Sequence, residues 1–129
     1  MKFLISILLV FAAAAAGFSQ NDITGEVAAA IKKGDAASIA AHMMPQIELT
    51  LNGQDNTVGK TDAQKSLTVF FKDHPVTGFS IKHQGTSKLD DQYRIGDLST
   101  QKGNFRVTFF MKKSGNAMQI RQLKIEAAE

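Results

Sequence analysis

The hydrophobic periodicity of the chain changes near His74-Pro75, and this change limits the folds that it can adopt. Before that point, except over residues 47–51, apolar residues recur every three or four positions, which is typical of amphipathic helices. After it, apolar and polar residues alternate through four segments separated by turns that contain glycine, which is typical of antiparallel strands. Helices grouped early and strands grouped late predict an α+β protein rather than a parallel α/β sheet.

Two short helices are expected at the start of the folded region. Asn21 or Asp22 can cap the first helix, and Gly34 is placed to end it. Asp35 can cap the second helix, which runs to about residue 43 and is ended by Pro45. Both helices therefore have a start signal and a stop signal in the sequence.

One strand and a third helix follow before the periodicity changes. Apolar and polar residues alternate over 47–51, which predicts a strand, and the polar residues 52–59 are expected to form a loop. The third helix is expected to begin at Thr61 or Asp62 and to end at His74. Three helices, with one strand between the second and the third, are thus expected to pack on the later sheet.

The later strands each have one face on which apolar residues gather. The residues in phase with one another are, strand by strand, Phe79, Ile81 and His83; Tyr93, Ile95 and Asp97; and Phe105, Val107, Phe109 and Met111. The last strand is expected over 118–125, where the alternation slips between Ile120 and Leu123. This slip predicts a β-bulge near Arg121.

The first 19 residues have the composition of an export signal. Lys2 supplies the positive charge, residues 3–16 are apolar with one exception, and Gly17 and Ser19 have the small side chains that signal peptidase requires. The apolar run is too short to span a bilayer comfortably. We expect cleavage after Ser19, export to the periplasm, and a single soluble domain over 20–129 that is not held in a membrane. The alternatives are a cut inside the alanine run 12–16 and an uncleaved anchor.

Composition excludes several classes of function. The chain has 129 residues, of which 43% are hydrophobic, enough for one domain with a real core. It has no cysteine, which excludes disulfides, thiolate nucleophiles and cysteine metal sites. The formal net charge is +3, and loss of Lys2 leaves 14 basic against 12 acidic residues. That excess is too small to predict nucleic-acid binding.

A series of motifs over residues 22–127 resembles a family of exported bacterial proteins, domain of unknown function 4783. The motifs are Phe70-Phe71, His74-Pro75, Phe79, the segments 83–87 and 93–98, Thr100, and the segment 103–107. The family is similar to the nuclear-transport-factor-two-like superfamily, also called cystatin-like or ketosteroid-isomerase-like. The resemblance implies a cone in which a strongly curved antiparallel sheet wraps a long helix and leaves an internal pocket. It carries over no catalytic residue, and the superfamily includes isomerases, dehydratases, transport factors and binding modules.

His83 and Asp97 are the only candidates for catalysis. If their strands are neighbours, both side chains could point into the cone, where the carboxylate would hold the imidazole in one tautomer for acid–base work. The structural alternative places His83 at the rim and Asp97 at a strand end. His42, His74 and His83 lack the spacing of a metal site, and no P-loop or dinucleotide motif is present. We therefore expect no metal and no cofactor.

A surface role is the other possibility. Arg106 and Arg121 are expected to face outward together with Arg94, as a basic stripe that could contact an acidic partner or a second copy of the chain. Phe110 has the parity of this outer face and would favour a dimer there. The opposite expectation, a bulge that turns Phe110 inward, is equally compatible with the pattern.

The function that the sequence favours is binding. A small apolar ligand in the cone would contact Tyr93, His83, Phe79 and Phe109, whereas a protein partner would dock on the outer sheet face. The first alternative is a small acid–base enzyme of the isomerase or dehydratase type. The second alternative is a structural homodimer whose cone is filled by side chains.

Overall fold

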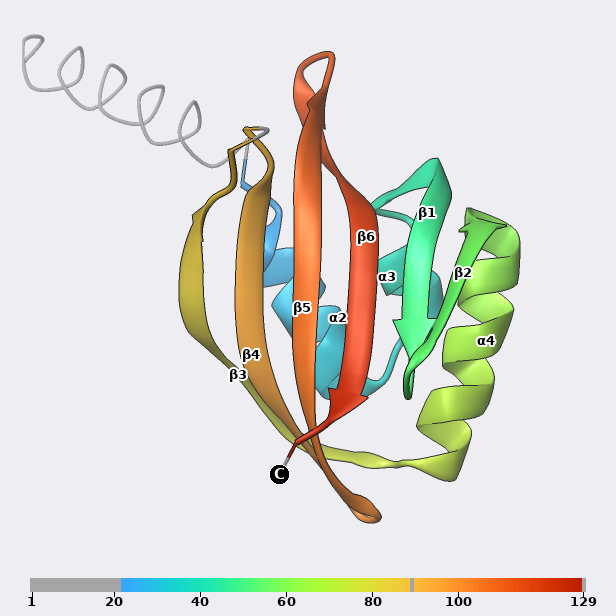
Figure 1. The fold of residues 1–129 in the computed structure, drawn as a ribbon. Coiled ribbons are helices and arrows are strands. Elements are labelled where there is room, and N and C mark those ends of the chain that lie inside the picture. The colour runs from blue at the N-terminus through green and yellow to red at the C-terminus, as the bar shows by residue number, and fades with distance from the viewer. Residues whose placement is uncertain (1–21, 89, 129) are drawn as a thin grey trace, which may run out of the picture.

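The computed structural model describes residues 22–88 and 90–128 (Figure 1). The predicted signal peptide and its cleavage site lie outside these residues. The elements follow one another as α2 (Thr24–Lys33), α3 (Ala36–Ala40), β1 (Met43–Leu51), β2 (Gln54–Gly59), α4 (Lys60–Asp73), β3 (Val76–Thr86), β4 (Gln92–Thr100), β5 (Gly103–Ser114) and β6 (Ala117–Ala127). Within the described part of the chain, no helix has the length and apolar character needed to cross a membrane.

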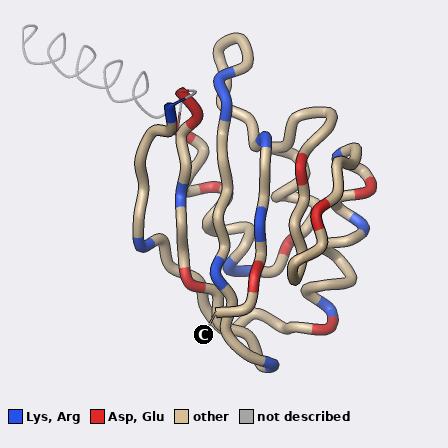
Figure 2. Tube along the Cα trace, in the orientation of Figure 1, with Lys and Arg blue, Asp and Glu red and all other residues tan. Residues whose placement is uncertain are grey.

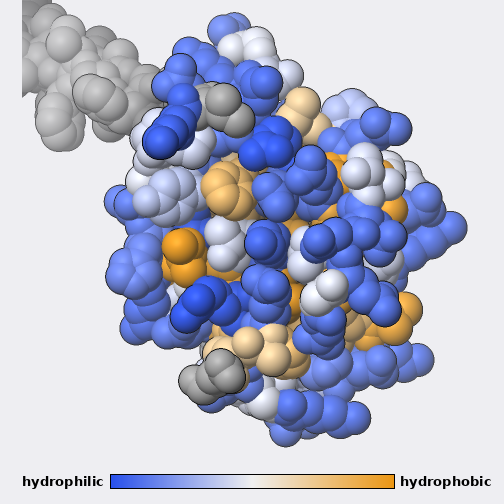
Figure 3. Space-filling view, in the orientation of Figure 1, coloured by the Kyte–Doolittle hydropathy of each residue, from blue (hydrophilic) through white to orange (hydrophobic). Residues whose placement is uncertain are grey.

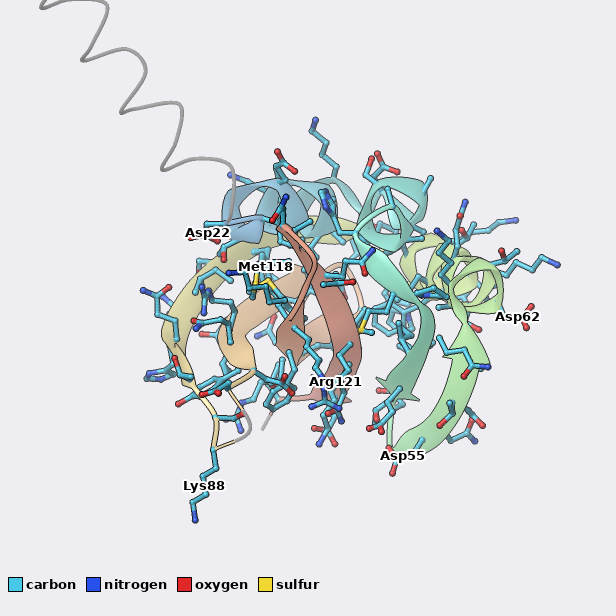
Figure 4. All side chains as sticks on the ribbon, turned by 90° about the horizontal axis from the view of Figure 1, so that it is seen from above. Asp22, Asp55, Asp62, Lys88, Met118 and Arg121 are labelled. Atoms are coloured by element: carbon cyan, nitrogen blue, oxygen red, sulfur yellow. The ribbon has the colours of Figure 1, made fainter. Side chains whose placement is uncertain are left out.

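The strands form one six-stranded sheet in the order β2-β1-β6-β5-β4-β3. All neighbours are antiparallel except β1 and β6, which pair in parallel, so the expectation of a purely antiparallel sheet is wrong. The sheet is curved, with α2 and α3 on its inner side and α4 beside β1 and β2 (Figures 1 and 4). The fold is thus α+β with a mixed sheet and its helices on one side.

The segment 52–59, expected to be a loop, is a turn followed by strand β2. Asn52 and Gly53 both have positive φ values, 50° and 84°, and join β1 to β2 as a tight hairpin. The alternation of apolar and polar residues did not predict β2 because its first four residues are all polar and exposed. An edge strand can have such residues because it is paired on one side only.

Pro45 lies inside β1. The expectation that it directly follows the second helix and ends it is wrong. The second helix ends earlier, at Ala40, and β1 begins at Met43. Pro45 is tolerated because the pairing of β1 with β6 shifts between Met43 and Glu48, where the ladder needs no regular N–H donor.

The predicted stop of the first helix at Gly34 and the predicted cap of the second at Asp35 are confirmed, whereas the N-cap of α2 is Ile23 and not Asp22. Gly34 adopts the left-handed conformation (φ 65°), and its backbone N–H donates to Ile31 O at 2.9 Å, which closes α2. The carboxylate of Asp35 accepts a hydrogen bond from Ser38 N at 3.2 Å at the start of α3. These two residues make the turn that lays α2 and α3 side by side.

The inner face of the sheet and the helices enclose one apolar core. Strand β5 contributes the four residues predicted from its alternation, Phe105, Val107, Phe109 and Met111, all of them buried. The predicted bulge in β6 is also confirmed, since the register between β5 and β6 shifts where Arg121 lies. Buried side chains fill the interior, and the cavity of interest lies at one end of it.

Candidate functional site

A cavity of about 290 Å³ opens at the end of the molecule where α2 begins and the β5–β6 hairpin overhangs the sheet. Asp22 precedes α2, and Met118 lies at the start of β6. Figure 4, seen from above, labels both at this opening. The remaining lining residues come from β4, from the end of β5 and from the hairpin turn; they are Gln92, Arg94, Met111, Lys113, Asn116 and Ala117.

Arg94 forms the charged wall of this cavity. Its side chain lies on the inner face of β4 with only 10% of its area exposed, so the expectation that it faces outward with Arg106 and Arg121 is wrong. The guanidinium Nε donates to Thr24 Oγ1 at 2.9 Å, and Nη1 donates to the Tyr93 carbonyl oxygen at 2.9 Å. Two hydrogen bonds therefore fix the plane of a nearly buried cation.

Asp22 stands at the mouth of the cavity, opposite Arg94. Its Oδ1 accepts a hydrogen bond from Thr24 N at 2.9 Å and lies 4.0 Å from Arg94 Nη2. Hydrogen bonds from Thr24, and secondarily the charge of Arg94, hold the pKa of Asp22 below its usual value. Asp22 is consequently a carboxylate at neutral pH, and its interaction with Arg94 is lost only as the pH falls through that lowered pKa.

Apolar side chains form another part of the cavity wall, beside the polar Gln92, Lys113 and Asn116. Met111 is buried on the inner face of β5, and Met118 lies half-buried on β6. Unbranched thioether side chains adapt to ligands of different shape. The cavity thus combines one oriented cation with an adaptable apolar wall.

His83 and Asp97 do not point into the cone, and the placement predicted for them is wrong. Ile81 lies opposite Gly96 on β4, yet His83 lies opposite Ile95, so one extra residue on β3 turns His83 to the outer face. Asp97 is exposed on the same outer face, because the inward residue beside it is Leu98. Among the described residues, no hydrogen bond or ion pair joins the two side chains.

The four residues expected to contact an apolar ligand are divided between the two faces of the sheet. Phe109 is fully buried in the core, and Phe79 lies half-buried on the inner face. Tyr93 and His83 lie on the outer face. The structure therefore does not bring these four residues together, and none of them lines the cavity.

The residues predicted for an interface, Phe110, Arg106 and Arg121, all lie on the outer face of the sheet. Arg121 Nε donates to Oδ2 of the buried Asp91 at 2.7 Å, and its guanidinium lies 5.7 Å from the centre of the Phe110 ring. The Tyr93 ring lies 6.0 Å from that of Phe110. We name Asp91, Tyr93, Phe110 and Arg121 the outer cluster.

The surroundings of the outer cluster are mainly hydrophilic. Figure 3 shows apolar side chains in separate patches on this face, and Figure 2 shows acidic and basic residues interspersed along the strands. Among residues 22–88 and 90–128, no three His, Asp or Glu side chains gather closely enough to hold a metal ion.

Sequence reasoning missed Asp22, Arg94 and Asp91 as site residues. Because Tyr93 and Ile95 are apolar, the alternation predicted that they lie on the inner face of β4 and that Arg94, between them, lies on the outer face. That prediction is wrong. One signal for the correct inner face was the apolar Leu98. It is an even number of positions from Gly96 and Arg94, so all three residues lie on the same face of β4. The pairing of Asp91 with Arg121 depends on a register that alternation alone does not provide.

The chain matches the model of the family described as domain of unknown function (DUF4783) over residues 24–126, and it belongs to that family. A family protein from Bacteroides ovatus is 32% identical, with a TM-score of 0.79 over 84% of this chain and 98% of that one. Another, from Bacteroides fragilis, is 30% identical, with a TM-score of 0.78 over 83% and 100%.

More distant structures share the fold alone. An uncharacterized cystatin-fold protein from Novosphingobium aromaticivorans is 13% identical, with a TM-score of 0.54 over 78% of this chain and 92% of that one. The resemblance to the cystatin-like, or nuclear-transport-factor-two-like, cone fold is thereby confirmed. No curated protein matches the sequence.

Proposed function

We propose that this protein is an exported binding module that holds a small organic molecule in the cavity at the open end of the cone. The observation that carries the proposal is the cavity itself, with a buried, oriented Arg94 on one side and Met111 and Met118 on the other. Its volume of about 290 Å³ is close to the lower end of the range for small-molecule sites. Convergent polar groups on an apolar wall are the usual composition of such sites.

An acid–base enzyme is less well supported. Such a mechanism needs a base within hydrogen-bond reach of its orienting carboxylate and of a substrate pocket. His83 and Asp97 are both exposed on the outer face and neither lines the cavity. The residues that do line it offer a cation and a carboxylate for binding rather than a base with an orienting partner.

Native mass spectrometry of the protein isolated from its own periplasm tests the binding role. We expect additional mass that is lost on denaturation. The variant Ala117→Trp, which places an indole at the wall of the cavity, is expected to lose that mass. The control Ala29→Trp alters an exposed position on α2 away from the cavity and should retain it. A ligand that survives Ala117→Trp unchanged would place the binding site elsewhere.

The second candidate is association of two copies of the chain through the outer sheet face. Tyr, Phe and Arg are the side chains that contribute most binding energy at interfaces, and the outer cluster holds them in contact. Nearby, Asp97, Arg106 and Glu126 lie opposite one another on adjacent strands. A row of alternating charge can meet its own copy with opposite charges aligned. The mass of the native particle shows whether it contains one chain or two. If it contains two, Phe110→Ser should convert the dimer to a monomer.

The ion pair of the outer cluster gives a further prediction. Asp91→Asn is expected to lower the free energy of unfolding by about 1–2 kcal/mol, because the nearly buried carboxylate that accepts from Arg121 loses its charge. Asp90→Asn is the matched control, since Asp90 is exposed and asparagine tolerates its positive φ of 65°. Chemical denaturation measures both. Equal effects would mean that the pair contributes nothing to stability.

A further inference from the structure

We infer that the cavity selects a compact organic anion, such as a short carboxylate, whose charged end contacts Arg94 and whose apolar end lies against Met111 and Met118. This inference rests on the binding role proposed above and specifies the class of ligand. It depends on three features of the site: the free donors of Arg94, the balance of charge around the cavity, and the position of the apolar wall.

Arg94 has hydrogen-bond donors that are available to a ligand. Of its five N–H groups, one at Nε and one at Nη1 donate to Thr24 and Tyr93. No hydrogen bond of the remaining three, one at Nη1 and two at Nη2, is found in the described part of the chain. A buried guanidinium with open donors is a strong site for a planar anion, because two parallel N–H groups can bind one carboxylate.

The charges around the cavity leave an excess of one positive charge. Arg94 and Lys113 face it from β4 and β5, and among the described residues of the lining Asp22 is the one acidic side chain. Asp22 Oδ1 is 4.0 Å from Arg94 Nη2, too far for a hydrogen bond, and that oxygen already accepts from Thr24 N. Asp22 therefore offsets part of the charge of Arg94 without occupying its donors.

The apolar wall and the volume limit the rest of the ligand. Met111, Ala117 and Met118 provide a surface for a short hydrocarbon chain or ring. A volume of about 290 Å³ is close to the lower end of the range for small-molecule sites. The ligand class is therefore a compact organic anion.

The methionine methyl groups make the test specific to this cavity. In protein of residues 20–129 labelled with ¹³C at the methionine methyls, Met111 and Met118 line the cavity, whereas Met43 and Met44 do not. The probes are hexanoate, its neutral analogue hexanamide, and the cation hexylamine, each titrated to millimolar concentration at constant ionic strength. We expect hexanoate to shift the signals of Met111 and Met118, leave those of Met43 and Met44 in place, and bind at least tenfold more tightly than hexanamide.

Variants assign this preference to its residues. Lys113→Gln, at an exposed position, should weaken hexanoate by a few-fold while the fold is unchanged. Arg94→Gln should weaken it by roughly ten- to a hundredfold, as expected for loss of hydrogen bonds to a charged group, and should weaken the neutral hexanamide much less. If Arg94→Gln fails to fold, Lys113→Gln and the comparison of the three probes still decide the matter.

The outcomes separate the inference from the proposed function. Equal binding of hexanoate and hexanamide, or tighter binding of hexylamine, would overturn the anion preference and leave the binding role intact. If none of the probes moves the signals of Met111 and Met118, the cavity is not a site for molecules of this size, and both proposals are wrong.

Discussion

Replacing Phe109 by alanine is expected to lower the free energy of unfolding by about 3–5 kcal/mol, the usual cost of removing a buried phenylalanine ring. Phe109 is fully buried on the inner face of β5, in the middle of the sheet. Its ring lies opposite Leu123 on β6 and beside Arg94 on β4, so the cavity left by alanine cannot close without moving two strands.

Phe110→Ala is the matched control for this substitution. The two phenylalanines are adjacent in the chain, yet Phe110 is half-buried on the outer face, where it contacts Tyr93 and Arg121. We expect a loss of about 1 kcal/mol there, from partial burial and one ring contact. Urea denaturation of both variants measures the difference. Similar losses for the two variants would contradict the assignment of inner and outer faces to β5.

Elements with a local signal could be predicted from the sequence. Gly34 and Asp35 specify the turn between α2 and α3, because a left-handed glycine and a capping carboxylate act within a few residues. Strand β5 was predicted with the correct buried face, since its inward positions are all apolar. The bulge at Arg121 was visible because two apolar residues of β6 fall out of phase.

Features that depend on pairing between distant strands could not be predicted. The parallel pairing of β1 with β6 joins segments separated by α4 and four strands. The extra residue on β3 that turns His83 outward leaves no trace in the alternation of Phe79, Ile81 and His83. The predicted placement of His83 inside the cone is wrong because it required regular alternation across that position.

Strand β4 explains why the candidate site was missed. Its apolar residues Tyr93 and Ile95 lie on the outer face, and its inner face begins with Gln92 and the buried Arg94. A charged residue on an inner face is costly unless it is hydrogen-bonded, and Thr24 of α2 supplies part of that requirement. The same residue thus links the start of α2 to the sheet and presents its free donors to the cavity.

On the inner face of β4, the position two residues after Arg94 has room only for glycine, and Gly96 occupies it. A Cβ at this position would lie 2.6 Å from Ser80 O and 2.7 Å from atoms of the Phe79 ring, closer than carbon atoms pack. Because Ser80 O is a backbone atom, it cannot move without displacing β3. Gly96→Ala is therefore expected to lower the free energy of unfolding by about 2–3 kcal/mol through overpacking.

Gly78→Ala on β3 is the control for Gly96→Ala, because a Cβ there would meet no atom within 4 Å. We expect that variant to stay within about 0.5 kcal/mol of the parent protein, as is usual for substitutions free of steric conflict. The contact of the Phe79 ring with Gly96 also sets how the edge strand β3 lies against β4, beside Arg94. Thermal denaturation that ranks the two variants equally would mean that Phe79 does not cover Gly96 and that β3 pairs with β4 in a different register.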